Sequence, residues 1–402
     1  MTFNELIYIC GPNVFEVGGC VRDEIMNIPI NDYDYCVVSD VKSFESSFPN
    51  AVPVGNNFPV YLFRKGDECV EVSLTRLEKS NGVGYNDFEV THVGVSIEED
   101  LSRRDFTINS FAKNYITGEI IDPFGGQEDV KKKLIRTINP DCFSDDPLRL
   151  IRAARFAARF DFNIEEKTFE MMKDNANSIV HIPKERIVLE LEKVYKGNGN
   201  YKKFFDVLSE CGVLKYIFPD VEMLKLVPAG PEKYHGNLTA YEHTMNVVDK
   251  TKGKGFHVFV AALFHDIGKG KTSKEILPHH FGHELESYYM LKEFMSNHCF
   301  DSFTRDFAIF CALNHMKAHV IHKMRTTKLI NFFKNIPRRY YVDFLVMVNC
   351  DHEFNEEQKL VKKKLDILRE TCKIDVDRVK AVKDKEREVK RQMVEFYNKL
   401  EV

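Results

Sequence analysis

Two aspartates spaced as Asp-x-Asp, Asp32 and Asp34, form the first group of side chains that can do chemistry. In a strand, residues i and i+2 share a face, so both carboxylates would point to one side and could hold divalent ions together. Two such ions can activate an attacking hydroxyl and stabilise the leaving oxygen of an in-line phosphoryl displacement. The nearby Gly18, Gly19 and Arg22 suit a triphosphate, because glycine allows close backbone approach and arginine supplies positive charge. A lone Asp-x-Asp is more often a pair of exposed strand or turn acids, but the accompanying glycines and arginine favour phosphoryl transfer.

A second group of metal-binding side chains lies further along the chain. His243, the adjacent pair His265 and Asp266, and Asp351 occur in that order, and the pair directly follows an apolar run at residues 258–264. Neutral imidazole and carboxylate together suit a catalytic divalent transition ion. An isolated His-Asp pair is most often a polar helix end, but this one precedes Gly-Lys and is flanked by further ligand types. The order therefore predicts a second metal site.

The motifs of the first half resemble those of the class II tRNA nucleotidyltransferases, the bacterial CCA-adding enzymes, and of their poly(A) polymerase relatives. The first family motif, Gly-Gly-x-Val-Arg-Asp followed by Asp-x-Asp, is matched at residues 18–23 and 32–34. The family usually has glycine where this chain has Asn27, and because asparagine tolerates a positive φ we expect the turn to be kept. Glu71 stands where these enzymes carry an acid facing the metal pair, and Arg76 follows it as a candidate phosphate contact.

The second family motif, which the resemblance assigns to triphosphate and ribose binding, is matched at residues 103–109. Within it, Asp105 would accept a hydrogen bond from a ribose hydroxyl. Residues 145–149 resemble the family's Glu-Asp-x-x-Arg, with Asp in place of Glu at the first position. In the family the second Asp and the Arg read the base edge in place of a template. Here these are Asp146 and Arg149, which lie side by side on the first turn of a predicted helix. A helix cap followed by proline accounts for the segment as well, and both interpretations can hold together.

These matches imply an enzyme that adds C, C and A from CTP and ATP to the 3′ end of tRNA. The predicted catalytic residues are Asp32, Asp34 and Glu71, with Mg²⁺ held by the two aspartates. The predicted nucleotide-binding residues are Gly19, Arg22, Arg104, Asp105, Asn109, Asp146, Arg149, Arg152 and Arg155. Residues 184–187 resemble a motif that braces this region in the family, although a surface ion-pair network explains them equally well. The glycine-rich residues 80–85 correspond to a loop that moves between C and A addition.

The second half resembles the HD phosphohydrolase superfamily, and its HDIGKG and LPHHFGHE segments match the HD domain attached to gammaproteobacterial CCA-adding enzymes. That resemblance implies 2′,3′-cyclic phosphodiesterase, 2′-nucleotidase and phosphatase activities with Ni²⁺, Mn²⁺ or Co²⁺. Its implied metal ligands are His243, His265, Asp266 and Asp351. His283 and His315 could supplement the site, bind substrate phosphate, or serve only a surface or core role. His-Glu follows Asp351 where the family usually has Gly-Arg, so we expect turnover to be weaker than metal binding suggests.

Two alternative functions stay open at this point. A poly(A) polymerase shares the predicted head and much of the neck, although the resemblance associates the attached HD domain with tRNA enzymes. The other alternative is a tRNA-binding HD phosphohydrolase with an inactive head. The intact DxD, RRD and DDxxR motifs argue against it, because a binding module needs no paired metal carboxylates. Full CCA addition, A-only addition and CC-only addition are all compatible with these motifs, as are a monomer and a homodimer.

The elements that must position these groups follow from hydrophobic periodicity. Short β-branched and aromatic runs such as VFEVGG, DYDYCVV, PVYLF and CVEVSL predict strands between residues 14 and 125. After Pro140 a period near 3.6 predicts helices, and Pro and Gly at residues 227–231 predict a linker. The predicted fold is an α+β nucleotidyltransferase head followed by an all-α neck, an HD helical domain and a helical tail. The predicted domains are residues 1–140 (head), 141–228 (neck for base recognition and tRNA binding), 229–355 (HD phosphohydrolase) and 356–402 (charged tail).

Bulk composition is that of a multidomain globular protein. The chain has 402 residues, which is longer than a domain built around a single hydrophobic core usually is. None of its apolar runs reaches the roughly 20 residues of a membrane helix. The first residues lack the basic start of a secretory signal, so we expect a cytoplasmic protein. Ten cysteines without a C-x-x-C pair indicate neither a zinc ribbon nor a disulfide framework, and we expect reduced, mostly buried thiols.

The net charge of −4 gives no overall basic signature for nucleic acid, so local patches must supply it. One candidate patch combines residues 131–133 with Arg136, although a lysine run is more often a solvated helix face. The other is a predicted helix with four arginines at helical spacing, namely Arg149, Arg152, Arg155 and Arg159. The charged helices of residues 356–402 are better explained by packing and solubility than by binding.

Overall fold

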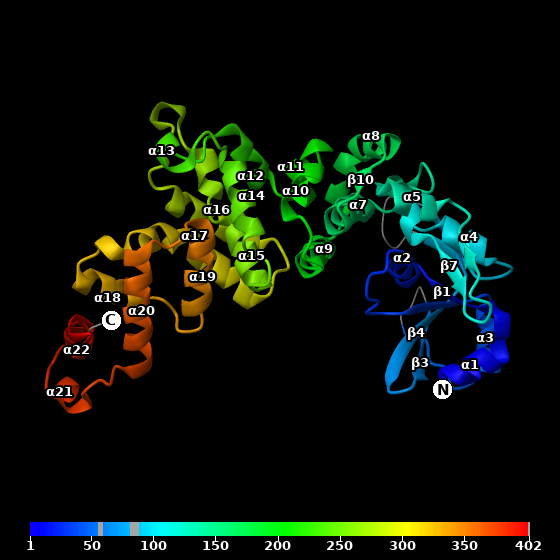
Figure 1. The fold of residues 1–402 in the computed structure, drawn as a ribbon, viewed down its shortest axis with the longest axis horizontal. Helices are drawn as coiled ribbons and strands as arrows, with labels where there is room; N and C mark the ends of the chain where they lie inside the picture. Colours follow the sequence, from blue (N-terminus) through cyan, green and yellow to red (C-terminus); the bar gives the residue numbers. More distant parts are fainter. Residues whose placement is uncertain (55–58, 81–87, 401–402) are drawn as a thin grey trace. The chain divides into compact units, whose positions relative to one another are not determined.

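The computed structural model describes residues 1–54, 59–80 and 88–400, which form two compact units, Met1–Ile217 and Phe218–Val402 (Figure 1). Residues 81–85 of the glycine-rich segment lie outside the described residues. The predicted change from a mixed α+β head to helical segments is confirmed, because the main sheet lies wholly in the first unit. The finer division of the chain at residues 140, 228 and 355 stays a prediction.

A six-stranded sheet with strand order β3-β4-β2-β1-β7-β8 forms the centre of the first unit. Its strands β2 and β4 run parallel, and the other neighbouring pairs run antiparallel. The four apolar runs that predicted strands correspond to the first four of them. The strands are β1 (Val14–Val17), β2 (Asp34–Val37), β3 (Val60–Lys65), β4 (Glu68–Leu74), β7 (Ala112–Asn114) and β8 (Ile120–Ile121).

Alternation along β4 explains how the sheet presents acidic side chains. Val70, Val72 and Leu74 are buried in the core beneath α1 (Phe3–Cys10) and α3 (Val41–Ser47), so the intervening Glu71 and Ser73 take the opposite face. Glu71 is the register partner of Asp34 on the neighbouring strand. Cross-strand partners share a face, so the sheet brings two carboxylates together from residues far apart in the chain.

Helices and short strands surround this sheet in the first unit. They are α2 (Gly19–Ile25), β5 (Leu77–Ser80), β6 (Phe88–Thr91), α4 (Ile97–Ser102), α5 (Gly126–Lys132), β9 (Leu134–Ile135), α6 (Cys142–Asp145), α7 (Leu148–Phe160), β10 (Asn163–Ile164), α8 (Glu166–Asp174), α9 (Lys184–Gly197), α10 (Tyr201–Glu210) and α11 (Leu214–Ile217). Strand β10 departs from the all-helical pattern predicted after residue 140. Asp161 ends α7 in a left-handed conformation (φ 55°), which turns the chain back so that β10 pairs in parallel with β9.

The second unit is helical throughout its described residues. Helix α15 is apolar and almost wholly buried, as expected for a central bundle helix, and packs against α14, α17 and α19. The helices are α12 (Pro219–Met223), α13 (Glu232–His235), α14 (Ala240–Asp249), α15 (Phe256–Phe264), α16 (His283–Ser296), α17 (Ser302–His319), α18 (Thr326–Lys334), α19 (Tyr341–Asp351), α20 (Glu356–Thr371), α21 (Val376–Lys380) and α22 (Lys385–Lys399). A short 3₁₀ helix, η5 (Ile267–Lys271), follows α15.

Two smaller expectations can be checked against the same structure. Within the described residues, none of the helices has both the length and the apolar character needed to cross a membrane. All ten cysteines are free thiols, and six of them are buried.

Candidate functional site

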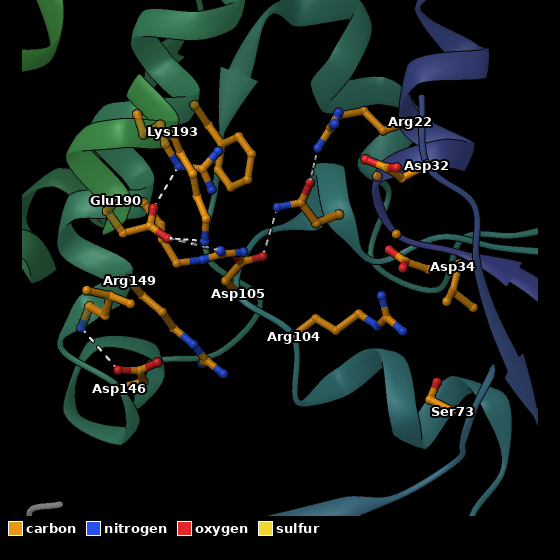
Figure 2. Close-up of a pocket in the computed structure, with 18 of the residues that line it drawn as sticks. Arg22, Asp32, Asp34, Ser73, Arg104, Asp105, Asp146, Arg149, Glu190 and Lys193 are labelled. Carbon is orange, nitrogen blue, oxygen red and sulfur yellow. Dashed lines mark hydrogen bonds and ion pairs between the residues drawn. The ribbon is translucent and has the colours of Figure 1, made fainter. Parts of the chain in front are cut away.

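A cavity of about 870 Å³ in the first unit brings together every head residue predicted from the sequence. Figure 2 shows Asp32 and Asp34 on one side of this pocket, Asp146 and Arg149 on the other, and Arg104 and Asp105 between them. The predicted residues that line it are Gly19, Arg22, Asp32, Asp34, Glu71, Arg104, Asp105, Asn109, Asp146, Arg149, Arg152 and Arg155. Their individual roles remain predictions, but their convergence is a property of the fold.

Three carboxylates define the acidic side of the cavity. The sequence predicted that both aspartates lie within a strand. Asp34 is the first residue of β2, but Asp32 lies just before the strand. Desolvation raises the pKa of Asp34 above its ordinary value, and the negative charges of Glu71 and Asp32 raise it further, against the opposing effect of Arg104. A divalent cation would relieve this accumulation of charge, and an all-oxygen donor set fits a hard ion such as Mg²⁺.

Gly18 makes room for the guanidinium group of Arg104 beside these carboxylates. Its φ of 72° is left-handed, and a Cβ at this position would lie 2.8 Å from Nη1 of Arg104. Arg104 donates to Asp100 through Nη2 at 3.1 Å, while its buried Nε has no hydrogen-bond partner among the described residues. The turn after α2 also behaves as expected, because Asn27 adopts a φ of 54° where the family usually has glycine.

Asp105 connects the two sequence motifs of the cavity with helix α7. Its Oδ1 accepts from Asn109 Nδ2 at 2.9 Å and from its neighbour's backbone, and its Oδ2 accepts from Arg152 Nη2 at 2.6 Å. Asn109 in turn accepts from Arg22 Nη1 at 2.5 Å. Burial would raise the pKa of Asp105, but Arg152, Asn109 and Arg149 outweigh it and hold that pKa at about 2. A ribose hydroxyl would therefore have to share an oxygen that already accepts an N–H.

The predicted base-reading pair is held from two directions. Asp146 has an extended backbone and accepts from the Leu148 N–H at 3.1 Å. The predicted helix cap is not formed as expected, because the N-cap of α7 is Pro147 rather than Asp145 or Asp146. Arg186 on α9 contacts the Asp146 carboxylate through Nη2 at 3.1 Å, an ion pair that is compatible with both interpretations of residues 184–187. Arg149 donates to the backbone carbonyls of Cys142, at 3.3 Å, and Arg103, at 2.8 Å.

Sequence reasoning missed Glu190, the buried acid at the centre of this arginine-rich wall. It is 1% exposed and lies 2.7 Å from Arg155 Nε, 2.9 Å from Lys193 Nζ and 4.0 Å from Arg152 Nη1. Its position four residues after Arg186 on α9 places both on one helix face, which was the available signal. The acid allows several arginines to gather in a small volume without unopposed repulsion.

A second cluster, in the other unit, contains the four predicted metal ligands. They come from α14 (His243), the residues after α15 (His265 and Asp266) and the end of α19 (Asp351). His243 Nε2 lies 3.0 Å from Asp351 Oδ1, and His265 Nε2 lies 3.0 Å from Asp266 Oδ2. Burial lowers the pKa of His265, but Asp266 and Asp351 outweigh it and raise that pKa to about 10. Imidazole and carboxylate donors at these separations fit a divalent transition ion.

Further histidines complete this cluster. His283 on α16 and His315 on α17 both approach Asp266 Oδ1, at 3.1 Å and 3.4 Å, so the structure places them in the site. His319 was not predicted from the sequence, and its Nε2 lies 2.7 Å from Asp351 Oδ2. Its spacing of four residues from His315 on a helix was the signal that could have found it. His279 is exposed and stands outside the cluster.

Family comparisons divide the chain in the same order as the motifs. Residues 14–136 match the Poly A polymerase head domain, residues 161–224 match the "Probable RNA and SrmB- binding site of polymerase A", and residues 238–368 match the HD domain. The cavity thus falls largely within the first match and the histidine cluster within the third.

Individual relatives carry the assignment further. The structure titled Bacillus stearothermophilus CCA-adding enzyme in complex with CTP is 22% identical, with a TM-score of 0.65 over 90% of this chain and 81% of that one. The Thermotoga maritima CCA-adding enzyme complexed with tRNA is 20% identical, with a TM-score of 0.65 over 99% and 92%. Both show the shared fold. The multifunctional CCA protein of Actinobacillus pleuropneumoniae serotype 5b (strain L20) is 37% identical over 84% of each chain. The chain belongs to the family of multifunctional CCA proteins, nucleotidyltransferases that carry an HD domain.

Proposed function

We propose that the first unit adds C, C and A, from CTP and ATP, to the 3′ end of tRNA without a nucleic-acid template. One observation carries this proposal: a single cavity contains the carboxylates suited to triphosphate chemistry and, opposite them, an Asp-Arg pair suited to reading a base edge. A nucleotide whose phosphates lie near Asp32 and Asp34 could place its base near Asp146 and Arg149. The names of the relatives, CCA proteins and CCA-adding enzymes, support the same activity.

In the proposed reaction the 3′ oxygen of tRNA attacks the α-phosphorus of the nucleotide, and pyrophosphate leaves. Asp32 and Asp34 would hold Mg²⁺ with Glu71, and bound Mg²⁺ would supply charge stabilisation to the attacking and leaving oxygens. Arg22 and Arg104 supply positive charge along the path of the phosphates. Their salt bridges to Asp23 and Asp100 fix both guanidinium groups before substrate arrives.

Base choice in this proposal depends on groups that are already immobile. The Asp146 carboxylate is held by Arg186, and two backbone carbonyls hold the Arg149 guanidinium. A fixed acceptor beside a fixed donor can present the edge that a Watson–Crick partner would offer to C and A. Pre-organisation of this kind favours the correct base because a wrong one leaves buried polar groups unpaired.

The test uses tRNA lacking its 3′ end, tRNA ending in C and tRNA ending in CC, each incubated with one nucleoside triphosphate at a time. We expect CTP to extend the first two substrates and to stop at CC, and ATP to add one residue to the third. A long homopolymer from ATP alone would instead identify a poly(A) polymerase. No extension of any tRNA would leave the alternative in which the head only binds tRNA.

We further propose that the second unit hydrolyses phosphate from tRNA ends or from small phosphoesters. The buried His-Asp cluster supports this activity, since a transition ion held there would lower the pKa of bound water toward neutrality. The implied reactions are those of a 2′,3′-cyclic phosphodiesterase, a 2′-nucleotidase and a phosphatase, with Ni²⁺, Mn²⁺ or Co²⁺. His352 and Glu353 follow Asp351 where an arginine would hold a product phosphate, so we expect modest turnover.

This second activity is tested by measuring phosphate release and opening of a 2′,3′-cyclic phosphate across a panel of divalent metals. We expect activity with at least one transition ion and little with Mg²⁺, because imidazole ligands favour the former. If the wild-type chain shows neither reaction with any metal, the HD domain has a structural role here.

A further inference from the structure

The side chain of Lys65, the last residue of β3, is enclosed by aromatic rings in the first unit. Alternation along the strand places it on the same face as Phe63, which belongs to the buried core. Its Nζ lies 4.9–5.3 Å from the centroids of four rings, which are those of Phe3, Tyr33, Tyr35 and Tyr115. At such distances a cation is attracted to the electron-rich face of a ring. These four rings form what we call the Lys65 cage.

The Lys65 cage takes the place of the acidic partner that a partly buried lysine usually has. Lys65 Nζ donates to the Tyr35 hydroxyl at 2.5 Å, and burial raises the pKa of Tyr35, so this partner stays neutral. Among the described residues, Lys65 takes part in none of the salt bridges, whereas Lys113, on the neighbouring edge of the sheet, is paired with Glu24. Removing a charge from water is costly, so the rings must supply much of the compensation.

Tyr33 is the member of the cage that lies next to the predicted metal ligands. It stands between Asp32 and Asp34, which face the cavity (Figure 2). Successive residues alternate in direction, so the Tyr33 ring takes the opposite side of the chain. There it stacks on Tyr35, with ring centroids 6.3 Å apart and ring planes at 15°. Tyr35 is 1% exposed and Tyr33 is 39% exposed, so the cage attaches a partly exposed ring to the core.

The segment that carries Asp32 has few other restraints. Residues 29–33 belong to no helix or strand, and none of their backbone groups takes part in the hydrogen bonds of the described residues. Asp34, in contrast, is fixed as the first residue of β2 in register with Glu71. The place of Asp32 relative to Asp34 therefore depends on the ring contacts of Tyr33.

We propose that Lys65 is a positioning residue for the metal site of the first unit. Its charge holds the Tyr33 ring, and Tyr33 in turn holds Asp32 where it can share an ion with Asp34. Lys65 itself touches neither the ion nor the nucleotide. The catalytic consequence rests on the proposed nucleotide addition, but the placement of Asp32 can be measured without that reaction. A cage with a purely structural role would stabilise the first unit without changing the need for Mg²⁺.

The first test compares Lys65→Met, which keeps an apolar stem but no charge, with Lys65→Arg, which keeps a cation beside the rings. We expect Lys65→Met to raise the Mg²⁺ concentration for half-maximal CTP addition by about tenfold or more, as when groups that orient metal ligands are removed. At saturating Mg²⁺ its KM values for CTP and tRNA should match those of the wild type. Lys65→Arg should recover most of the loss. Lys42→Met, at an exposed lysine on α3, should leave the Mg²⁺ requirement unchanged.

A second pair of variants changes the ring rather than the cation. Tyr33→Phe keeps both the stacking and the cation contact, so its Mg²⁺ requirement should match that of the wild type. Tyr33→Leu keeps an apolar side chain but loses the aromatic face, and it should behave like Lys65→Met. Equal Mg²⁺ requirements for Tyr33→Leu and Tyr33→Phe would overturn the inference, since the ring would then not place Asp32.

Metal binding is also measured without nucleotide addition. Electron paramagnetic resonance of free Mn²⁺ gives the ions bound by the full-length chain with CTP and no tRNA, and Asp34→Asn gives the background bound elsewhere. After subtraction, Lys65→Met should bind Mn²⁺ about tenfold or more weakly than the wild type. If the wild type adds no nucleotide but Lys65→Met still weakens this binding, the proposed function fails and the positioning role stands.

Unchanged Mn²⁺ affinity and Mg²⁺ requirement in a folded Lys65→Met chain would overturn the inference. A lower melting temperature alone would assign the cage a structural role and would overturn it as well. Circular dichroism establishes folding, and if Lys65→Met does not fold, the two variants of the partly exposed Tyr33 decide.

Discussion

At the scale of single residues, several polar side chains of the cavity are fixed by partners from distant segments. Arg186, on α9, reaches the Asp146 carboxylate at the start of α7, and Arg22, on α2, reaches Asn109. Each contact joins residues far apart in the sequence, and each restrains a side chain that faces the cavity. Substrate selection should therefore depend on the restraining residues as well as on those that would touch the base.

Substitution of the base-reading pair should change nucleotide choice more than triphosphate binding. Arg149→Ala or Asp146→Ala removes a donor or acceptor from the base edge, which is worth about 1–3 kcal/mol of discrimination, or roughly 5- to 150-fold more misincorporation of G or U. Arg186→Ala should give a smaller loss, because Asp146 remains but is less restrained. Competition between nucleotides on tRNA ending in C measures the effect, with the surface substitution Lys202→Ala as a control. Strict C and A selection in all three variants would contradict the assignment.

At the scale of elements, contact between backbones decides whether distant ligands meet. Gly268 in η5 donates its N–H to Ser287 Oγ at 2.9 Å, and a Cβ at Gly268 would lie 2.6 Å from the Ser287 backbone nitrogen. Helix α16, which carries His283, thus lies against the turn that carries Asp266. Glycine at this position lets two metal-binding segments approach closely.

Gly268→Ala should separate η5 from α16 and weaken the HD metal site. Relieving such an overlap costs about 1–3 kcal/mol, and we expect roughly a tenfold or greater loss of HD metal affinity. The matched control is Gly270→Ala in the same 3₁₀ helix, where a Cβ would meet Met223 at an ordinary 3.4 Å. Isothermal titration with Co²⁺ compares the two variants. Equal affinities would show that this backbone contact does not position the ligands.

The hydrogen bond between Asp105, in residues 103–109, and Arg152, on α7, should make the stability of the first unit depend on pH. The pKa of Asp105 is about 2 in the folded protein against an ordinary 3.8, so its ionised form is favoured by folding. The stabilisation, about 2 kcal/mol, should be fully present above pH 4 and be lost as the pH falls toward 2. Urea unfolding should therefore show that the difference in the free energy of unfolding between wild type and Asp105→Asn becomes smaller as the pH falls over this range. A difference that stays constant over this range would contradict the prediction.

Elements were predictable from the sequence where the signal was local. Apolar alternation indicated β1 to β4, and the Asp-Asp-Pro segment indicated the start of α7 one residue from where it begins. The β9–β10 pair was missed, since two-residue strands carry no periodicity and depend on the turn at Asp161. Asp32 lies outside β2 for a related reason: strand ends are set by pairing with a neighbour rather than by the residue itself.

At the scale of the whole molecule, the short motifs predicted most of the side chains that converge in the two sites. The other site residues can be recognised only from their tertiary contacts. All head residues named from the motifs line one cavity, because each motif is contiguous and chemically distinctive. Glu190 and His319 were missed because their significance lies in partners 35 and 32 residues away, Arg155 and Asp351. A buried acid among arginines resembles any helix-surface charge until the packing is known.

The two predicted active sites share no residue, and each lies within one of the two compact units, Met1–Ile217 and Phe218–Val402. Two activities built in this way should be separable by mutation. Asp32→Asn removes a carboxylate of the head site and should lower nucleotide addition by about a thousandfold or more, equivalent to about 4 kcal/mol of transition-state stabilisation. The same substitution should leave phosphoester hydrolysis nearly unchanged.

The reciprocal substitution, in the HD cluster, should spare nucleotide addition. His265→Gln removes an imidazole of the HD cluster, so we expect loss of hydrolysis with every transition metal while CCA addition with Mg²⁺ continues at the wild-type rate. The two reactions should also separate by metal, because an all-carboxylate site favours Mg²⁺ and an imidazole-rich site favours Mn²⁺, Co²⁺ or Ni²⁺. Both reactions are measured on each full-length variant, with tRNA lacking its 3′ end and with a 2′,3′-cyclic phosphate. If either substitution abolished both activities in a folded chain, the sites would not be independent, and the assignment of one reaction to each unit would have to be abandoned.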